Sequence, residues 1–155
     1  MFRVRAKKLK EKLMSKAEEV KKHLMEAVDL WSMEQVRKIH STNQSIEDRI
    51  GQMPQSEKEL VDLRAFIKQT KDVTSPELAA LLKDVENHYV MLDTFSFFYK
   101  EEDIEALMLQ KTWPSKIEMA IGLSKEQIEA QEEMMKGKLE TEQGVFAKDM
   151  LEYEK

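Results

Sequence analysis

The chain has 155 residues and a formal net charge of -5, with 4 Gly, 3 Pro, 11 Met and no Cys. This length fits one domain, and the scarcity of chain-breaking residues excludes collagenous, low-complexity and loop-rich proteins. The absence of cysteine excludes a disulfide framework, a thiolate zinc site and a cysteine nucleophile. The composition therefore predicts an all-α protein, an elongated helical bundle with antiparallel, coiled-coil-like long helices.

The first part of the chain predicts one long helix, from residue 2 to about 50, with two apolar stripes. The first stripe has an eleven-residue repeat, which stays nearly straight along an α-helix. Its members are Leu9, Leu13, Ala17, Val20, Leu24, Val28 and Trp31. The second stripe has heptad-like steps, as in a coiled coil. Its members are Val36, Ile39, Asn43, Ile46, Ile50 and Met53. The change of period predicts a bend or a change of partner helix between the two.

Positive charge is concentrated at the beginning of this helix. Residues 1–22 contain nine basic and three acidic residues, so they carry +6 and the rest of the chain carries -11. We interpret the basic segment as a solvated helix face or the complement of an acidic neighbour, since no aromatic or Gly-rich pattern indicates nucleic acid. No apolar segment follows it, so we expect no secretory signal. No apolar run has the roughly 18–20 residues that a membrane span needs, so no membrane partner is expected.

A break in the helical pattern follows the second stripe. Gly51 is typical of the position after a helix, and Pro54 cannot continue the helical hydrogen bonds. Ser56 and Glu59 then form a capping box. The second helix is therefore expected to begin at about residue 56 and to extend to about 72.

Three further helices are expected. The third, 76–93, has Pro76 in its first turn, the fourth spans 101–111, and Trp113-Pro114 opens a last helix over 114–154. Short connections favour antiparallel neighbours; they are expected at 51–56, 71–76 and 111–114. We expect the long first and last helices to be antiparallel partners or extensions. The last helix contains three interior glycines, Gly122, Gly137 and Gly144. Each costs about 1 kcal/mol of helix stability relative to alanine, so this helix needs a packing partner.

Aromatic residues gather around the fourth predicted helix. Closely spaced aromatic residues at a junction between elements usually bury one another, which favours a corner of the core over a docking surface. The candidate patch for packing or docking is Phe95, Phe97, Phe98, Tyr99, Trp113 and Pro114.

No residue pattern indicates catalysis. His23, His40 and His88 lack the Glu-x-x-His spacing of a bundle di-iron site, and the glycines are too scattered for a phosphate-binding loop. The carboxylates lie on predicted solvent faces, whereas acid-base chemistry needs desolvated ones in a cleft. We therefore predict no catalytic residue, no cofactor, no metal site and no enzymatic activity for this segment.

Three runs of residues together resemble the tail of dynein heavy chains. Residues 49–63 (RIGQMPQSEKELVDL) are similar to that family's junction of a long helix, a proline and Glu-Leu-x-x-Leu. Residues 89–95 (YVMLDTF) and 111–117 (KTWPSKI) follow in the family's order. The Trp-Pro-x-x-Ile step, followed by a long charged helix, resembles the axonemal members most. The resemblance covers essentially the whole chain, and it is strongest over 36–150.

This resemblance implies a stem segment that adjoins the linker of an axonemal dynein heavy chain. Such a segment is a non-catalytic helical scaffold that supports the linker and motor in microtubule-based ciliary movement. The implied partners are flanking heavy-chain segments, dynein intermediate or light chains, and a neighbouring heavy chain. The implied location is the cytoplasm, cytoskeleton and ciliary axoneme. The parent would be a microtubule-dependent ATPase motor whose nucleotide sites lie far C-terminal to this segment.

Two other interpretations remain open from the residues. The mixed stripes over Leu9 to Met53 are also typical of a self-standing spectrin-like or coiled-coil cytoskeletal adaptor whose first helix dimerises. The basic residues within 3–22 would also suit a binder of nucleic acid or of an anionic surface. Within the dynein interpretation, the three glycines of the last helix are a departure that puts its straightness in doubt.

Overall fold

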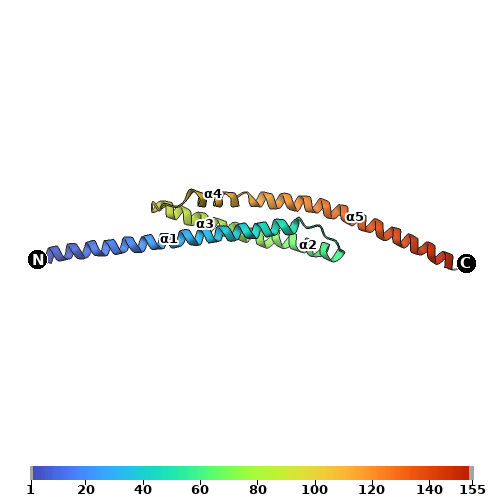
Figure 1. Ribbon diagram of the computed structural model, residues 1–155, viewed down its shortest axis with the longest axis horizontal. Helices are drawn as coiled ribbons and strands as arrows, with labels where there is room; N and C mark the ends of the chain where they lie inside the picture. The colour runs from blue at the N-terminus through green and yellow to red at the C-terminus, as the bar shows by residue number, and fades with distance from the viewer. Residues whose placement is uncertain (1, 154–155) are drawn as a thin grey trace. The chain divides into compact units, whose positions relative to one another are not determined.

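The structure is a computed structural model that describes residues 2–153, with side chains described from residue 5 onward. Within these residues all regular structure is helical, which confirms the predicted all-α bundle (Figure 1). The elements are α1 (Phe2–Ile50), α2 (Glu57–Gln69), η1 (Thr70–Thr74), α3 (Ser75–Thr94), α4 (Glu101–Gln110) and α5 (Trp113–Tyr153). Residue 154, to which the last helix was expected to extend, lies outside the described residues.

The chain forms two compact units, and each unit combines two separate stretches of sequence. Unit 1 consists of Met1–Asn43 and Thr74–Trp113, and unit 2 consists of Gln44–Val73 and Pro114–Lys155. Most of α1 therefore lies in unit 1 together with α3 and α4, whereas α2 and nearly all of α5 lie in unit 2. The last turns of α1 also belong to unit 2.

Unit 1 is built around one face of α1. Helix α3 runs antiparallel to α1, and α4 reverses direction again after the segment 95–100 (Figure 1). The three helices enclose an apolar cluster whose buried members are Met25, Val36, Val85, Tyr89, Leu92 and Leu107. Burial of this kind of surface is the main stabilising contribution to a small helical unit.

The buried seam of α1 begins at Met25, eleven residues before the seam that the apolar pattern predicts. Its members follow alternating steps of four and three residues, and most are buried. They are Met25, Asp29, Ser32, Val36, Ile39, Asn43, Ile46 and Ile50. Leu24, by contrast, is 62% exposed. The first stripe is thus exposed as far as Leu24, whereas its later member Val28 packs against the core. The helix runs through residues 31–36 without a break.

Unit 2 packs α2 against the last turns of α1 and against α5. In this unit α2 is the antiparallel neighbour of both long helices (Figure 1). The core side chains are aliphatic, and they are Ile46, Ile50, Leu60, Leu63, Ile67, Ile117, Ile121 and Ile128.

The segment that joins α1 to α2 is held by hydrogen bonds at Pro54 and at the beginning of α2. The backbone N–H of Glu59 donates to Ser56 Oγ (3.3 Å), and the Glu59 carboxylate accepts from the backbone N–H of Gln55 (2.7 Å). The predicted capping box is thus present, with its return bond one residue before the cap. Gln131 Nε2, on α5, donates to the carbonyl oxygen of the buried Pro54 at 2.6 Å.

A π-helical turn, η1, occupies the place where a short connection was expected at 71–76. Thr74 has right-handed helical torsion angles, and Pro76 lies in the first turn of α3. Proline lacks an N–H and disrupts ordinary α-helical hydrogen bonding, and single π turns are a known way to accommodate such an interruption. The backbone therefore stays helical from Glu57 to Thr94.

Candidate functional site

The predicted aromatic patch divides into separate environments in the structure. Phe97 and Tyr99 pack against the core of unit 1, and the Tyr99 ring lies edge-on to Tyr89 with centroids 5.4 Å apart. These two residues therefore contribute to packing.

The other two aromatic residues of the 95–99 run face outward. Phe95 is half exposed, and the ammonium group of Lys21 lies over its ring in a cation–π contact, 5.4 Å from the ring centroid. Phe98 is 95% exposed. Ser96, between Phe95 and Phe97, has a left-handed φ of 55° and closes α3 with a Schellman-type bond from Phe97 N–H to Leu92 C=O (2.9 Å). The turn at Ser96 separates the outward-facing Phe95 from Phe97, which packs against the core.

Trp113 and Pro114 begin α5 but differ in burial. Trp113 is 3% exposed, and its ring lies edge-on to His40 with centroids 5.6 Å apart. Pro114 is exposed at the beginning of the helix, where its missing N–H needs no helical acceptor. The predicted patch thus divides into three packing residues, Phe97, Tyr99 and Trp113, and three exposed ones, Phe95, Phe98 and Pro114.

A partly buried polar cluster in unit 1 was not predicted. It consists of Asp29 on α1, Tyr89 on α3 and Asp103 in the first turn of α4. Burial, with a further contribution from the Asp103 carboxylate, raises the pKa of Asp29 above its ordinary value. Burial and the two carboxylates likewise raise the pKa of the Tyr89 hydroxyl. Asp29 and Tyr89 therefore favour their protonated forms more than they would in water.

The signal that identifies Asp29 is its register. Counting back from Val36 in heptad steps leads through Ser32 and Asp29 to Met25, so polar residues occupy two seam positions. Asp103 is 9% exposed, although it belongs to an acidic stretch that is typical of the solvent-exposed first turn of a helix. It comes near Asp29 only through the packing of α4 in the fold.

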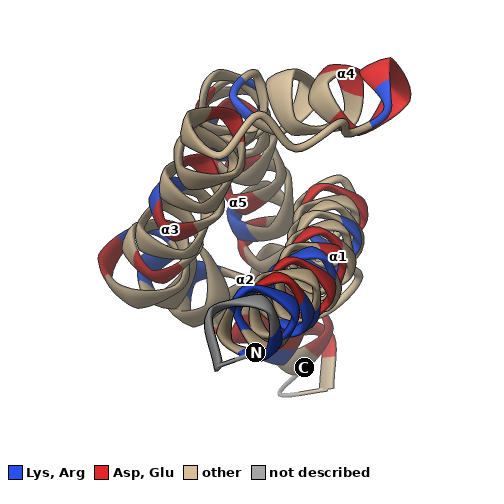
Figure 2. Ribbon diagram, turned by 90° about the vertical axis from the view of Figure 1, so that its left-hand side faces the viewer, with Lys and Arg blue, Asp and Glu red and all other residues tan. Residues whose placement is uncertain are grey.

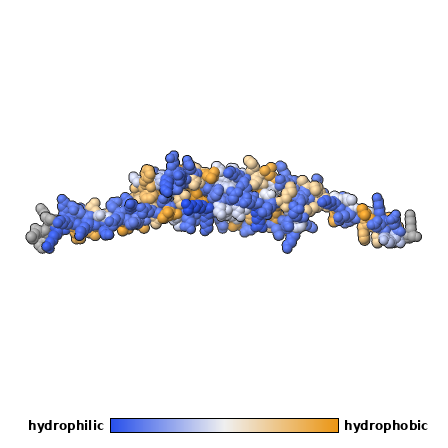
Figure 3. Space-filling view, viewed as in Figure 1, coloured by the Kyte–Doolittle hydropathy of each residue, from blue (hydrophilic) through white to orange (hydrophobic). Residues whose placement is uncertain are grey.

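A surface of a different kind lies on the N-terminal part of α1. Every residue from 5 to 24 is exposed, and Leu13 and Leu24 are each 62% exposed. Residues 5–24 include eight basic and three acidic side chains. Figure 2 shows the basic residues on the N-terminal turns of α1, and Figure 3 shows hydrophobic atoms among hydrophilic ones along the same stretch. We call the exposed side chains Leu9, Leu13, Val20 and Leu24 the α1 stripe.

The α1 stripe has the features of a helix-docking surface. With Ala17 between Leu13 and Val20, the apolar residues follow steps of three and four, which match the contacts of paired helices, and contiguous exposed apolar residues mark interaction surfaces. The surplus of positive charge fits a partner helix with acidic flanks. On the polar side, Lys16 pairs with Glu19 at 3.1 Å and Lys22 with Glu26 at 3.9 Å.

Across residues 2–153, no three His, Asp or Glu side chains come close enough together to hold a metal ion. None of the described helices combines the length and the apolar character that crossing a membrane requires. No protein-family model, curated protein or solved structure matches this chain.

Proposed function

We propose that the chain is a non-catalytic stem segment of an axonemal dynein heavy chain, a helical scaffold that adjoins the linker and supports the motor. The proposal rests on the three runs that carry the family resemblance, because each run lies at a helix junction. Residues 49–63 span the junction of α1 and α2, residues 89–95 end α3, and residues 111–117 begin α5.

The apolar members of these runs supply core residues. Ile50, Leu60 and Leu63 are buried in unit 2, and Leu92 and Trp113 are buried in unit 1. A scaffold needs its junctions fixed by such packing, because a load carried along helices is lost wherever a joint yields. The burial of core residues at the junctions supports a mechanical role. The order of the three runs supports the assignment to the dynein family.

In this role the α1 stripe is a contact for further heavy-chain segments or for an accessory chain. Residues 5–24 of this 49-residue helix are exposed, which suits a helix that packs against further segments of a larger stem. The outward-facing Phe95 and Phe98 offer a second contact of the same kind.

An antibody raised against this chain tests the proposal directly. In salt extracts of ciliary axonemes from the source organism, we expect it to detect a polypeptide of heavy-chain size, hundreds of kilodaltons, that co-sediments with microtubules in the absence of ATP. The transcript is expected to continue in frame into repeated Gly-x-x-x-x-Gly-Lys-Ser/Thr modules. A polypeptide of about the size of this chain, or a transcript without such modules, would overturn the assignment.

A self-standing coiled-coil or spectrin-like adaptor is the second candidate. The observation that favours it is again the α1 stripe, which two copies of the chain would cover by pairing. Sedimentation equilibrium over a wide range of concentration separates the two ideas. A monomer at all concentrations excludes the homodimeric adaptor, and a dimer that is lost with Leu13→Gln and Leu24→Gln supports it.

A further inference from the structure

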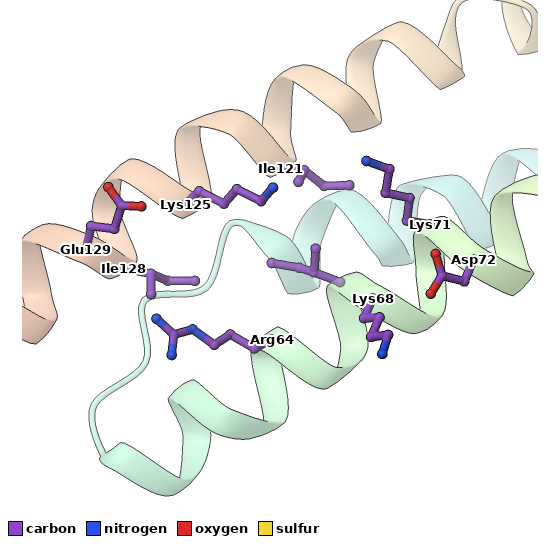
Figure 4. Close-up of a pocket in the computed structure, with 9 residues that line it drawn as sticks. Arg64, Lys68, Lys71, Asp72, Ile121, Lys125, Ile128 and Glu129 are labelled. Carbon is purple, nitrogen blue, oxygen red and sulfur yellow. The ribbon is translucent and has the colours of Figure 1, made fainter.

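Unit 2 contains a groove between α5 on one side and α2 with η1 on the other (Figure 4). Three isoleucines form its floor, Ile67, Ile121 and Ile128, and all three are buried. The groove has a volume of about 490 Å³, which lies within the range of about 300–1,000 Å³ for small-molecule sites. Its floor therefore offers an apolar surface for a ligand of modest size.

The rim of the groove is predominantly basic. Arg64, Lys68, Lys71 and Lys125 line it, against Asp72 and Glu129. Arg64 is already paired, since its Nη2 lies 2.9 Å from Glu132 Oε1. Figure 4 shows the Glu129 carboxylate pointing away from the groove. Lys68, Lys71 and Lys125 then remain against the single carboxylate of Asp72, so the surplus charge of the rim is positive.

Two of these lysines face each other across the floor. The side chains of Lys71 and Lys125 extend from opposite walls toward Ile121 (Figure 4). Within the described part of the chain, neither lysine forms an ion pair. Two ammonium groups directed at one gap repel each other, and an anion placed between them removes that repulsion and gains attraction to both.

The position of Lys71 depends on the π-helical turn. Lys71 and Asp72 both lie in η1, which widens the helical path beside the groove. Such turns occur frequently at functional sites. The turn and the lysine pair are separate observations that lead to the same groove.

We propose that this groove binds a monomeric anionic amphiphile, a phosphate monoester whose headgroup lies between Lys71 and Lys125 and whose aliphatic tail lies on the isoleucine floor. A phosphate monoester carries a charge of about -1.5 to -2 near neutral pH, which matches two ammonium groups. Lysine binds phosphate as a point charge and needs no fixed fork geometry. This inference is independent of the stem assignment and goes beyond it.

Octyl phosphate, below its micelle concentration, is a suitable probe for isothermal titration and for amide chemical-shift mapping. We expect saturable one-site binding, with the largest shifts at residues around Lys71, Ile121 and Lys125. Two control compounds each contain one of the recognised groups: inorganic phosphate has the charge, and octanol has the alkyl tail. Both are expected to bind at least tenfold more weakly than octyl phosphate, because one lacks the tail and the other lacks the charge.

A charge-matched pair of variants tests the assigned residues. The double variant Lys71→Gln/Lys125→Gln is expected to lower the affinity for octyl phosphate about tenfold or more. The control Lys58→Gln/Lys136→Gln makes the same change of net charge on α2 and α5 outside the groove, and its affinity is expected to stay within about twofold of the parent's. All four lysines are exposed, so the fold should persist, which circular dichroism verifies.

Three outcomes would overturn the proposal. The first is no saturable binding of monomeric octyl phosphate at millimolar concentration. The second is an equal loss of affinity in the groove variant and in the control variant, because that result indicates adsorption by net charge. The third is binding only to vesicles containing phosphatidic acid and not to the monomer, because that result assigns the lysines to a membrane surface.

Discussion

Leu24 and Met25 are neighbours in α1 but lie in opposite environments: Leu24 is 62% exposed and Met25 is 8% exposed. Met25 begins the buried seam, whereas Leu24 belongs to the α1 stripe. The division between scaffold and contact surface therefore runs along a single helix, and one step in the sequence crosses it.

Alanine at these two positions separates the two roles. We expect Met25→Ala to lower the free energy of unfolding by about 2 kcal/mol, because it leaves a cavity in the core of unit 1. Leu24→Ala is expected to change it by less than about 0.5 kcal/mol. Urea unfolding followed by circular dichroism measures both values. Equal losses at the two positions would mean that Leu24 is covered in solution.

Ser96 adopts a left-handed backbone conformation, which glycine adopts more easily than other residues. Its φ of 55° is left-handed, which costs a residue with a side chain about 1–2 kcal/mol. Glycine at this position would avoid that cost, but the greater conformational freedom of glycine in the unfolded chain offsets part of the gain in stability. We therefore expect Ser96→Gly to raise the free energy of unfolding by about 0.5 kcal/mol. The control Ser41→Gly, on an exposed helical position of α1, should lower it.

The raised pKa of Asp29 predicts a pH-dependent effect of its removal. A carboxyl group whose pKa is raised by folding favours the folded state only below its unfolded value, about 3.8, and that contribution is lost as the pH rises through the folded value. At pH 7 we expect Asp29→Asn to stabilise the chain by less than about 1 kcal/mol, since water screens a part-exposed group. The gain should shrink as the pH falls toward 4.

Thermal unfolding of parent and variant between pH 3.5 and 8 measures this difference. The exposed control Asp84→Asn, on α3, should show no comparable trend. A gain that grew on acidification would contradict the assigned cause.

Gln131 joins α5 to the segment before α2 through its bond to the Pro54 carbonyl. Gln131→Leu removes the donor and leaves a buried acceptor without its partner. We expect a loss of about 1–2 kcal/mol in unfolding free energy. Gln127→Leu, on an exposed position of the same helix, is the matched control and should be nearly neutral. Comparable losses in both variants would show that the bond contributes little.

The glycines of α5 provide a test of its exposed end. Nothing lies within 4 Å of a Cβ added at Gly137 or Gly144, so alanine fits at both without strain. Each change should favour the helix by about 1 kcal/mol, which corresponds to about fivefold slower amide exchange over 136–153. The midpoint of global unfolding should change little. Unchanged exchange rates would indicate that other contacts hold this part of the helix.

Local patterns in the sequence predicted the fold class well. The Ser56–Glu59 cap and the opening of α5 at Trp113 were predicted because each depends on a few adjacent residues. The seam of α1 was predicted only from Val36 onward. Asp29 and Ser32 are polar, and an apolar pattern cannot count them as core residues.

Other features depend on contacts between residues distant in the sequence. The cluster of Asp29, Tyr89 and Asp103 exists only because three helices meet. The separation of Phe95 from Phe97 occurs at the left-handed turn of Ser96, a conformation that residues with a side chain rarely adopt. The π turn was missed because Ser75-Pro76 is equally typical of a new helix after a loop.

The order of the two units along the sequence has a consequence for any shortened form of this chain. The pieces alternate, with a stretch of unit 1, a stretch of unit 2, the rest of unit 1 and the rest of unit 2. No single cut can release one unit whole without carrying along, or stranding, part of the other. A splice variant or a proteolytic product that ends near residue 113 would keep unit 1 intact but expose the aliphatic face of α2, and such a fragment should aggregate.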